Sequence, residues 1–225
     1  MPDVDFDVVL MVGVGAANAG ELVVDGRGIA FVCLEHFTGV ANPADLHGRI
    51  MIAPGIDYLE RSFDASKYGE IPEQPYLDMT IPTLGDATLA PAGRHVLSVH
   101  VQFVPHQLRD NGRWDDTREQ LASTVLRTLE QYAPGIGSLV EATQVLTPAD
   151  LEQQYGLSGG QIYHGEPSLD QLFTMRPILG WAQYNSPIDG LFLCGTGTHP
   201  GGGITGASGQ NAAREIVKSL KSRRK

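Results

Sequence analysis

The sequence has only two cysteines, Cys33 and Cys194, and neither belongs to a C-x-x-C pair. A disulfide framework, a zinc ribbon and a dithiol redox centre are therefore unsupported. Both thiols lie in apolar runs, where we expect buried, inert cysteines. The seven histidines are scattered, and His95 and His100 share one expected strand at an odd spacing that points them to opposite faces. We therefore expect no metal site.

The sequence also lacks a long apolar run. Crossing a membrane takes about 18 or more consecutive apolar residues, and no segment approaches that length. A signal peptide begins basic and then turns apolar, whereas the first residues here are acidic. These two absences predict a protein without a membrane span that stays in the cytoplasm.

Positive charge is scarce outside the C-terminal end. The chain carries 16 Lys and Arg against 26 Asp and Glu, and six of the 16 lie in the last twelve residues. The acidic remainder would repel nucleic acid, whose affinity depends largely on neutralising phosphates. We interpret the basic end as a solvated helix end whose cations suit the negative C-terminal dipole, with contact to RNA or anionic lipid as the alternative.

What is present fits a globular protein of one large or two small domains, since 42% of the 225 residues are hydrophobic. The opening segment, 6–35, predicts strand, glycine turn, short helix and strand, and its first run is typical of a parallel sheet. Gly13 and Gly15 match the first two glycines of the dinucleotide-binding G-x-G-x-x-G pattern, with Asn18 in place of the third. Glu35 stands where a carboxylate meets ribose hydroxyls. An FAD-type β-α-β unit and an ordinary strand-turn-strand both remain open.

The middle of the chain shows the alternation of half-buried strands in two segments. Residues 76–81 and 94–104 predict antiparallel neighbours, joined by an ordered loop rather than a tight hairpin. A short strand within 49–53 and another over 139–146 are also expected. The inward side chains of the second long strand are predicted to be Leu97, Val99, Val101 and Phe103.

The clearest helix is expected over 117–132, with Asp116 and Glu119 as a capping box. Its apolar stripe consists of Leu121, Val125, Leu129 and Tyr132. A second helix is expected over 56–67.

A third helix follows from its end signals. Thr147 is suited to the N-cap and Pro148 to the first helical position, and Gly156 ends the pattern.

The most unusual segment follows a predicted strand over 191–194. Of the fifteen residues 195–209, seven are glycine, and a helix over 205–219 with Ile216 and Leu220 as anchors comes next. Glycine permits a ligand to approach bare backbone, and a helix start attracts negative charge. A Walker loop is unsupported because the required Lys is missing. A flavin fits better, and a purely structural turn is the alternative.

The string L-F-L-C-G-T-G-T-H-P-G-G-G-I-T-G-A-S-G-Q-N-A-A resembles the C-terminal FAD motif of the phytoene desaturase-like FAD-dependent oxidoreductases. Within them it is most similar to the branch called pyridine nucleotide-disulfide oxidoreductase domain-containing protein 2. The resemblance extends over roughly residues 48–220 and includes L-A-P-A-G-R-H-V-L-S (89–98), Y-A-P-G (132–135), L-T-P-A-D-L-E (146–152) and G-G-Q-I-Y-H-G-E-P-S-L-D-Q-L-F-T-M-R-P (159–177).

The resemblance implies FAD as cofactor and assigns the loop residues to its parts. Near the pyrophosphate and ribityl chain it implies Gly195, Thr196, Gly197 and Thr198. Beside the isoalloxazine it implies Pro200, Gly201, Gly202 and Gly203. At the N1–O2 edge of the ring it implies the amides of Ile204 and Thr205, while Gly13, Gly15 and Glu35 would belong to the opening FAD unit.

Substrate contacts are predicted for Tyr163, His164 and His199. Core packing is the alternative for the first two, and backbone shaping beside Pro200 is the alternative for His199. Asp170 and Arg176 are expected either to form a structural ion pair or to orient a ligand. No catalytic side chain is assigned, because a flavin would carry the chemistry itself.

Together these features predict a mixed α/β (α+β) fold. An FAD-binding Rossmann-like β-α-β unit would occupy residues 1–45, a substrate domain of mostly antiparallel sheet and helices 46–190, and the C-terminal FAD-binding strand, loop and helix 191–225. The implied activity is hydride abstraction from a small apolar or amphipathic substrate to FAD.

Members of the family are considerably longer, so we expect a fragment, a shortened relative or one part of a split enzyme that lacks the large middle region. Exposed apolar surface should then drive homo-oligomerisation or association with another subunit. The rival functions are a non-catalytic module for partner binding or dimerisation and, on residues 6–35 alone, an NAD-dependent dehydrogenase.

Overall fold

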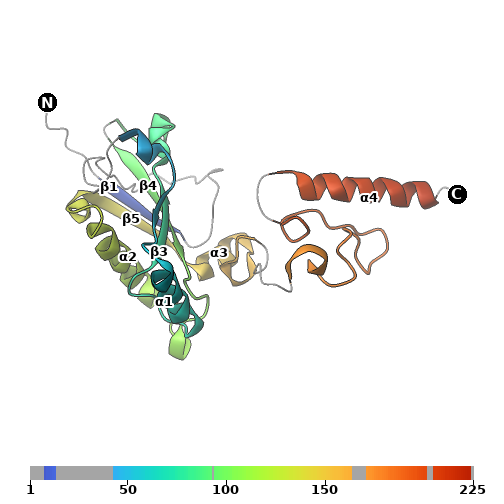
Figure 1. Cartoon of the computed structure of the whole chain (residues 1–225), viewed down its shortest axis with the longest axis horizontal. Helices are drawn as coiled ribbons and strands as arrows, with labels where there is room; N and C mark the ends of the chain where they lie inside the picture. Colours follow the sequence, from blue (N-terminus) through green and yellow to red (C-terminus); the bar gives the residue numbers. More distant parts are fainter. Residues whose placement is uncertain (1–7, 14–42, 93, 164–170, 202–204, 224–225) are drawn as a thin grey trace. The chain divides into compact units, whose positions relative to one another are not determined.

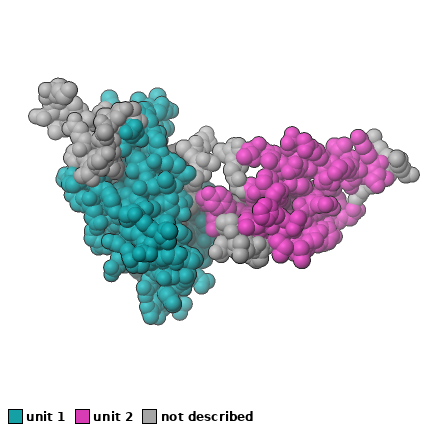
Figure 2. Space-filling model, viewed as in Figure 1, with its two compact units in different colours: residues 1–160 teal, residues 161–225 magenta. Residues whose placement is uncertain are grey.

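A computed structural model describes residues 8–13, 43–92, 94–163, 171–201 and 205–223 of the chain (Figure 1). The chain forms two compact units, residues 1–160 and 161–225 (Figure 2). The sequence-based division at residues 45 and 190 differs from this one. Each unit is described by itself below.

Within its described residues, the first unit is built on a five-stranded mixed sheet in the order β2-β3-β4-β1-β5. Its strands are β1 (Val8–Gly13), β2 (Ile50–Ile52), β3 (Tyr76–Thr80), β4 (His95–Gln102) and β5 (Val140–Leu146). The pairs β2–β3 and β3–β4 are antiparallel, and this confirms the antiparallel pairing expected for the second pair. The first strand lies between β4 and β5 and is parallel to both, which confirms the prediction of a parallel neighbourhood for this apolar run.

One face of this sheet forms the hydrophobic core with two helices, α1 (Ile56–Lys67) and α2 (Trp114–Glu130) (Figure 1). Burying each large apolar side chain contributes roughly 1.5–3 kcal/mol, so this face dominates the stability of the unit. Its almost fully buried members include Leu77, Met79, Leu97, Val99, Val101, Leu121, Val125 and Leu129, in agreement with the predicted stripes. Tyr132, the last member of the predicted helix stripe, is only half-buried.

Two details of this core differ from the sequence-based expectation. Phe103 is not an inward strand residue, because β4 ends at Gln102 and the backbone of Phe103 turns to φ 60°. Its half-buried ring instead packs against Phe63 and Tyr76, with centroid distances of 5.4 and 6.2 Å. The strand therefore stops one pleat earlier than its apolar pattern suggests.

Helix α2 also begins earlier than predicted. It starts at Trp114, and Arg113 occupies the N-cap without a side-chain hydrogen bond, so the capping box of Asp116 and Glu119 is wrong. Trp114 is buried and its indole N–H donates to the carbonyl of His106 at 3.1 Å. Burial of this ring brings residues 114–116 into the helix. Asp116 then lies in the first turn, where its negative charge suits the helix dipole.

Helix α3 (Pro148–Tyr155) agrees with the prediction at both ends. Thr147 and Asp150 form a reciprocal capping box, and Gly156 closes the helix in the left-handed conformation. Arg118 of α2 holds the same carboxylate with two hydrogen bonds of 2.6 and 2.9 Å and also donates to the carbonyl of Val145. One guanidinium thus joins α2, β5 and α3.

The second unit contains one long helix, α4 (Ala207–Arg223), and the short 3-10 helix Phe173–Met175 among its described residues. The strand expected over 191–194 is wrong: only Phe192 forms a bridge, to Asn185, because no described strand lies beside it to extend a ladder. Leu220 is 56% exposed and is not an anchor of α4, whereas Ala212 is buried.

Cys194 is exposed, in contrast to the buried thiol that the sequence predicts. Cys33 lies outside the described residues. None of the helices in the described ranges combines the length and the apolarity that crossing a membrane requires.

Two glycines at the end of the first unit test how closely the chain packs there. Gly156 and Gly160 both have positive φ, 67° and 68°, but only a Cβ at Gly160 would meet backbone, at 2.6 Å from Pro148. Gly156→Ala should lower the free energy of unfolding by about 1–2 kcal/mol, the strain of the left-handed conformation. Gly160→Ala should lower it by clearly more, about 3 kcal/mol or above. Urea unfolding of both variants measures the difference, and equal losses would contradict the close approach.

The carboxyl of Asp150 should govern part of the acid sensitivity. Burial acts to raise its pKa, but the hydrogen bonds from Arg118 and Thr147 prevail and lower the pKa to about 2, below the ordinary value of 3.8 for an aspartic acid. The ionised form therefore stabilises the fold above pH 4, and this contribution is lost as the pH falls through 2. Asp150→Asn should cost about 2 kcal/mol of unfolding free energy at pH 7 and flatten the loss between pH 4 and 2.

The matched control is Asp110→Asn. Asp110 is 93% exposed and has φ 57°, a conformation that Asn tolerates, so its unfolding free energy should change little. If both variants lost the same stability, or if Asp150→Asn kept the full acid dependence, the Arg118–Asp150 assignment would be refuted.

Candidate functional site

The described part of the glycine-rich loop, 195–201, is held by two successive turns around a buried threonine. The backbone N–H of Thr198 donates to the carbonyl of Gly195 at 3.0 Å, and its hydroxyl donates to the same oxygen at 2.9 Å. The backbone N–H of Gly201 donates to the carbonyl of Thr198 at 2.7 Å. Thr198 is only 2% exposed. This predicted cofactor residue therefore shapes the loop from within.

The glycines of this loop fall into two classes. Gly201 has φ 97°, which favours glycine for conformational reasons. Gly195 and Gly197 do not have a positive φ of this kind, and a Cβ at either would meet no heavy atom within 4 Å. Neither strain nor packing in the described chain explains glycine there. The loop thus presents bare backbone to open space at two positions where the sequence predicts a cofactor.

The following residue, His199, is fixed through its carbonyl. Tyr184 donates its hydroxyl to this oxygen at 2.7 Å, and the Ser208 hydroxyl donates to it at 3.4 Å. The Asn211 side-chain amide in turn donates to the Tyr184 hydroxyl at 2.8 Å. The loop is thereby tied to the first turns of α4. Sequence reasoning missed Tyr184 and Asn211, and only the helical spacing of Ser208 and Asn211 gave a signal for this contact.

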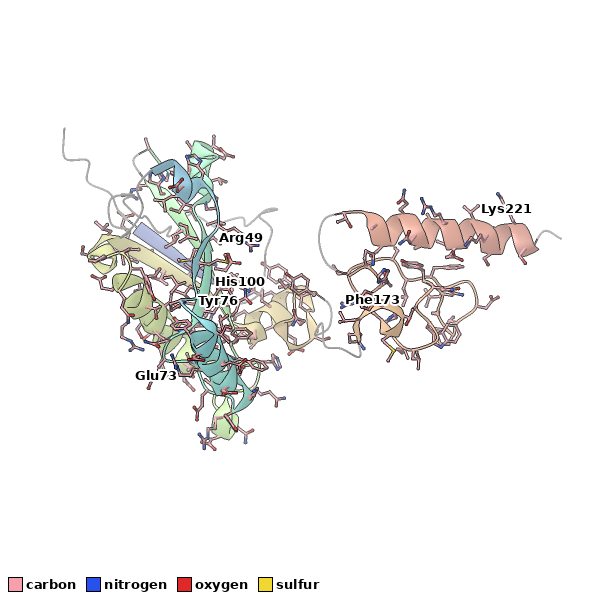
Figure 3. The ribbon with its side chains drawn as sticks, viewed as in Figure 1. Arg49, Glu73, Tyr76, His100, Phe173 and Lys221 are labelled. Carbon is pink, nitrogen blue, oxygen red and sulfur yellow. The ribbon has the colours of Figure 1, made fainter. Side chains whose placement is uncertain are left out.

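A pocket of about 220 Å³ lies beside the end of the loop. It brings together four residues that the sequence assigned to substrate or cofactor, namely Tyr163, His199, Pro200 and Gly201. The other lining residues are Gln171, Leu172, Phe173 and Arg176. The ring of Phe173, which is labelled in Figure 3, lies 6.3 Å from that of His199.

Arg176 is the most deeply buried charge of this pocket. It is 5% exposed, and its guanidinium donates through Nη2 to the carbonyl of Tyr163. Its Nε is buried without a hydrogen-bond partner. Asp170, the partner that the sequence suggested, lies outside the described residues.

The remaining predicted site residues lie partly within and partly outside the described residues. Outside the described residues lie Gly15, Glu35, His164, Gly202, Gly203 and Ile204. Thr205 is described and exposed, and its hydroxyl accepts the backbone N–H of Ala207 at 3.2 Å at the start of α4. Thr196 is half-buried.

A second pocket of about 370 Å³ lies between residues 185–192 and the C-terminal half of α4. Its lining includes Glu215 and Lys218, which form an ion pair of 2.5 Å with each other. None of the predicted site residues that the structure describes lines this pocket, so it does not enter the candidate site.

The first unit holds a polar cluster that the sequence analysis missed (Figure 3). Arg49 binds the carboxylate of Asp78 at 2.7 and 3.1 Å, and Asp78 is only 7% exposed. Its cross-strand partner on β4 is His100, which in turn pairs in register with Gly13 on β1. The available signal was Asp78 itself, an acid within an otherwise apolar strand.

Burial lowers the pKa of His100, and the positive charge of Arg49 lowers it further, while Asp78 acts in the opposite direction. The imidazole is therefore neutral at pH 7, and its Nδ1 is buried without a hydrogen-bond partner. This cluster and the loop belong to different units. Within the described ranges no group of three or more His, Cys, Asp or Glu side chains could hold a metal ion.

Comparison with known proteins agrees with this picture. No protein-family model matches the sequence. Pyridine nucleotide-disulfide oxidoreductase domain-containing protein 2 of Rattus norvegicus is 43% identical over 164 residues, 72% of this chain and 28% of that protein. The neurosporene-forming phytoene desaturase of Rhodobacter capsulatus is 30% identical over 176 residues, 77% of this chain and 32% of the relative. The lycopene-forming phytoene desaturase of Pantoea ananas is 31% identical over 160 residues, 71% of this chain and 32% of the relative.

The chain therefore spans about a third or less of these curated relatives. Over most of its own length, however, it is a homologue of pyridine nucleotide-disulfide oxidoreductase domain-containing protein 2 and of the phytoene desaturases.

Proposed function

We propose that this chain is the cofactor-closing and substrate-binding part of an FAD-dependent oxidoreductase that abstracts hydride from an apolar or amphipathic substrate. Its homology to proteins named oxidoreductase and phytoene desaturase supports the reaction class. Because the chain matches less than a third of the first of these, the complete activity needs the groups that the rest of such a protein supplies.

The observation that carries the proposal is the pair Gly195 and Gly197. Glycine in a folded chain weakens stability unless conformation, packing or a ligand requires it. At both positions the first two reasons are absent among the described residues. The same is true of Gly55, but Gly195 and Gly197 lie in the glycine-rich segment 195–209 before a helix, and a dinucleotide cofactor is a ligand for which such loops are built.

The residues of the loop fit a flavin dinucleotide in three respects. Thr198 keeps the turn closed from inside, so the backbone of Gly195 and Gly197 faces outward. The start of α4 supplies the positive end of a helix dipole, which favours an anionic group. Tyr184 and Asn211 hold the loop against that helix and so fix the distance between the two.

When bound, the flavin supplies the hydride-accepting chemistry. The residues of this chain would bind the flavin and the substrate and orient one toward the other. Pro200 and Gly201 border both the loop and the 220 Å³ pocket, so a substrate held there would lie next to the cofactor.

A second candidate function, a non-catalytic module for association with itself or another subunit, is favoured by the surface of the second unit. Large apolar side chains are exposed there well beyond the isolated cases usual on protein surfaces. The most exposed are Phe173, Ile178, Leu179, Ile188, Val217 and Leu220, at 48–72%. Such residues are expected where another chain covers them.

The two functions separate in one substitution, Gly197→Val. A Cβ there meets no heavy atom of the described chain within 4 Å, so the urea midpoint without cofactor should remain unchanged or rise slightly. A flavin that contacts this backbone would be displaced, and the dissociation constant for FAD should rise at least about tenfold, as 1.4 kcal/mol of lost contact requires. Quenching of FAD fluorescence measures the affinity.

The matched control is Gly55→Val, since a Cβ at Gly55 also meets no heavy atom within 4 Å. Its FAD affinity should equal that of the unaltered chain. Two results would refute the flavin site and leave the module as the better account. One is a chain that retains no yellow colour once free FAD has been removed. The other is a Gly197→Val variant that binds FAD normally.

Association through the second unit is tested by light scattering over a range of concentrations. The unaltered chain should show a mass above that of the monomer that rises with concentration. Leu179→Ser should shift this equilibrium toward monomer because it removes a side chain that is 67% exposed. Ile56→Ser, at a 78% exposed position in the first unit, is the control and should have no effect. A clean monomer at high concentration would exclude the association.

A further inference from the structure

Arg176 combines two properties that seldom occur together. It is about 95% removed from solvent, and no described carboxylate lies within ion-pair distance of it. Its one described hydrogen bond goes to a neutral acceptor, the carbonyl of Tyr163, and its Nε has none. Burial of a charge without an opposite charge is among the most unfavourable arrangements in a protein interior. The structure therefore holds a guanidinium whose charge is not compensated by the described chain.

This guanidinium lies in the wall of the 220 Å³ pocket, which gives an anion a route to it. The planar donor fork of Arg matches a carboxylate better than any other side chain does. The rest of the wall is suited to an apolar body, since Leu172, Phe173 and Pro200 also line the pocket. The described lining contains no carboxylate that would repel an anion.

We propose that the pocket beside Arg176 binds the carboxylate of an amphipathic carboxylic acid, with the apolar part of the acid against Phe173 and Leu172. The ligand class is thus an apolar acid rather than a neutral hydrocarbon. That this acid is the molecule oxidised rests on the proposed flavin function, because Pro200 and Gly201 border the pocket and are proposed to pass beside the flavin ring. The binding of the carboxylate itself does not depend on flavin.

The test uses the complete chain without cofactor and a pair of probes, 2-naphthoate and 2-naphthalenemethanol. The two share the same apolar rings and differ in the charge of the head group. Fluorescence titration should show that the acid binds at least about tenfold more tightly than the alcohol, the range expected for a charge-assisted hydrogen bond in a buried site. Equal affinities, or tighter binding of the alcohol, would overturn the proposal without any variant.

Two variants assign the preference to one side chain. Arg176→Gln should bind acid and alcohol equally, and Arg176→Lys should keep part of the preference because it retains a cation without the fork. Arg214→Gln removes the same charge from an exposed position on α4 and should keep the full preference. If Arg176→Gln does not fold by circular dichroism, the comparison of the two probes on the unaltered chain and on Arg176→Lys decides. An Arg176→Gln variant that folds and still prefers the acid would also overturn the proposal.

Repeating the titration with saturating FAD separates this inference from the proposed function. Unchanged preference for naphthoate in a chain that binds FAD supports both. Preference for naphthoate in a chain that never binds FAD supports the carboxylate site and removes the flavin function. Displacement of naphthoate by FAD would mean that Arg176 serves the cofactor, and the carboxylate proposal would fall while the flavin site stands.

Discussion

The carboxylate of Asp150 is the point at which three elements of the first unit meet. It accepts hydrogen bonds from the N-cap residue of α3 and from Arg118 of α2. The guanidinium of Arg118 also donates to the Val145 carbonyl near the end of β5. Burial alone would favour the neutral acid, but the donors outweigh it. The apolar face of the sheet supplies most of the stability, and this ion pair ties α2 to the end of β5 and to the start of α3.

The second unit is ordered by a different kind of interaction. It has one long helix and little other regular structure among its described residues. Backbone turns and side-chain hydrogen bonds to backbone carbonyls therefore hold it together in place of sheet hydrogen bonds. Tyr184, Ser208 and Asn211 all converge on the carbonyl of His199 or on each other. Such an arrangement fixes a short loop firmly while leaving its glycines facing outward, which is the combination that recognition of a ligand by backbone demands.

Sequence reasoning succeeded where the signal is local. Helix α1 has the predicted bounds, and α3 has the predicted caps at Thr147 and Gly156, because helix ends depend on a few neighbouring residues. Sequence reasoning failed where a contact with another segment of the chain decides where an element begins or whether it forms. The indole of Trp114 moved the start of α2, and the apolar run at 191–194 found no strand to pair with.

The same limit applies to the candidate site. The glycine loop, His199 and Tyr163 were visible in the sequence, because their pattern is contiguous and resembles known proteins. The cluster of Arg49, Asp78 and His100 was not visible, since it exists only through the register of β3 against β4. The isolation of Arg176 from any described acid was equally hidden, because it is a property of what surrounds the side chain.

The strand order has a consequence for how the first unit folds. Among the described strands β5 joins the sheet through β1 alone, and β1 is the partner of β4 as well, so residues 8–13 close two long loops at once. Each closure must order a large stretch of chain before its hydrogen bonds form. During synthesis the first strand therefore waits until residues 95–102 and then 140–146 have emerged. The backbone N–H and C=O groups of this apolar strand meanwhile lack their partners in β4 and β5, and the assembly of this unit depends on the last strand to arrive.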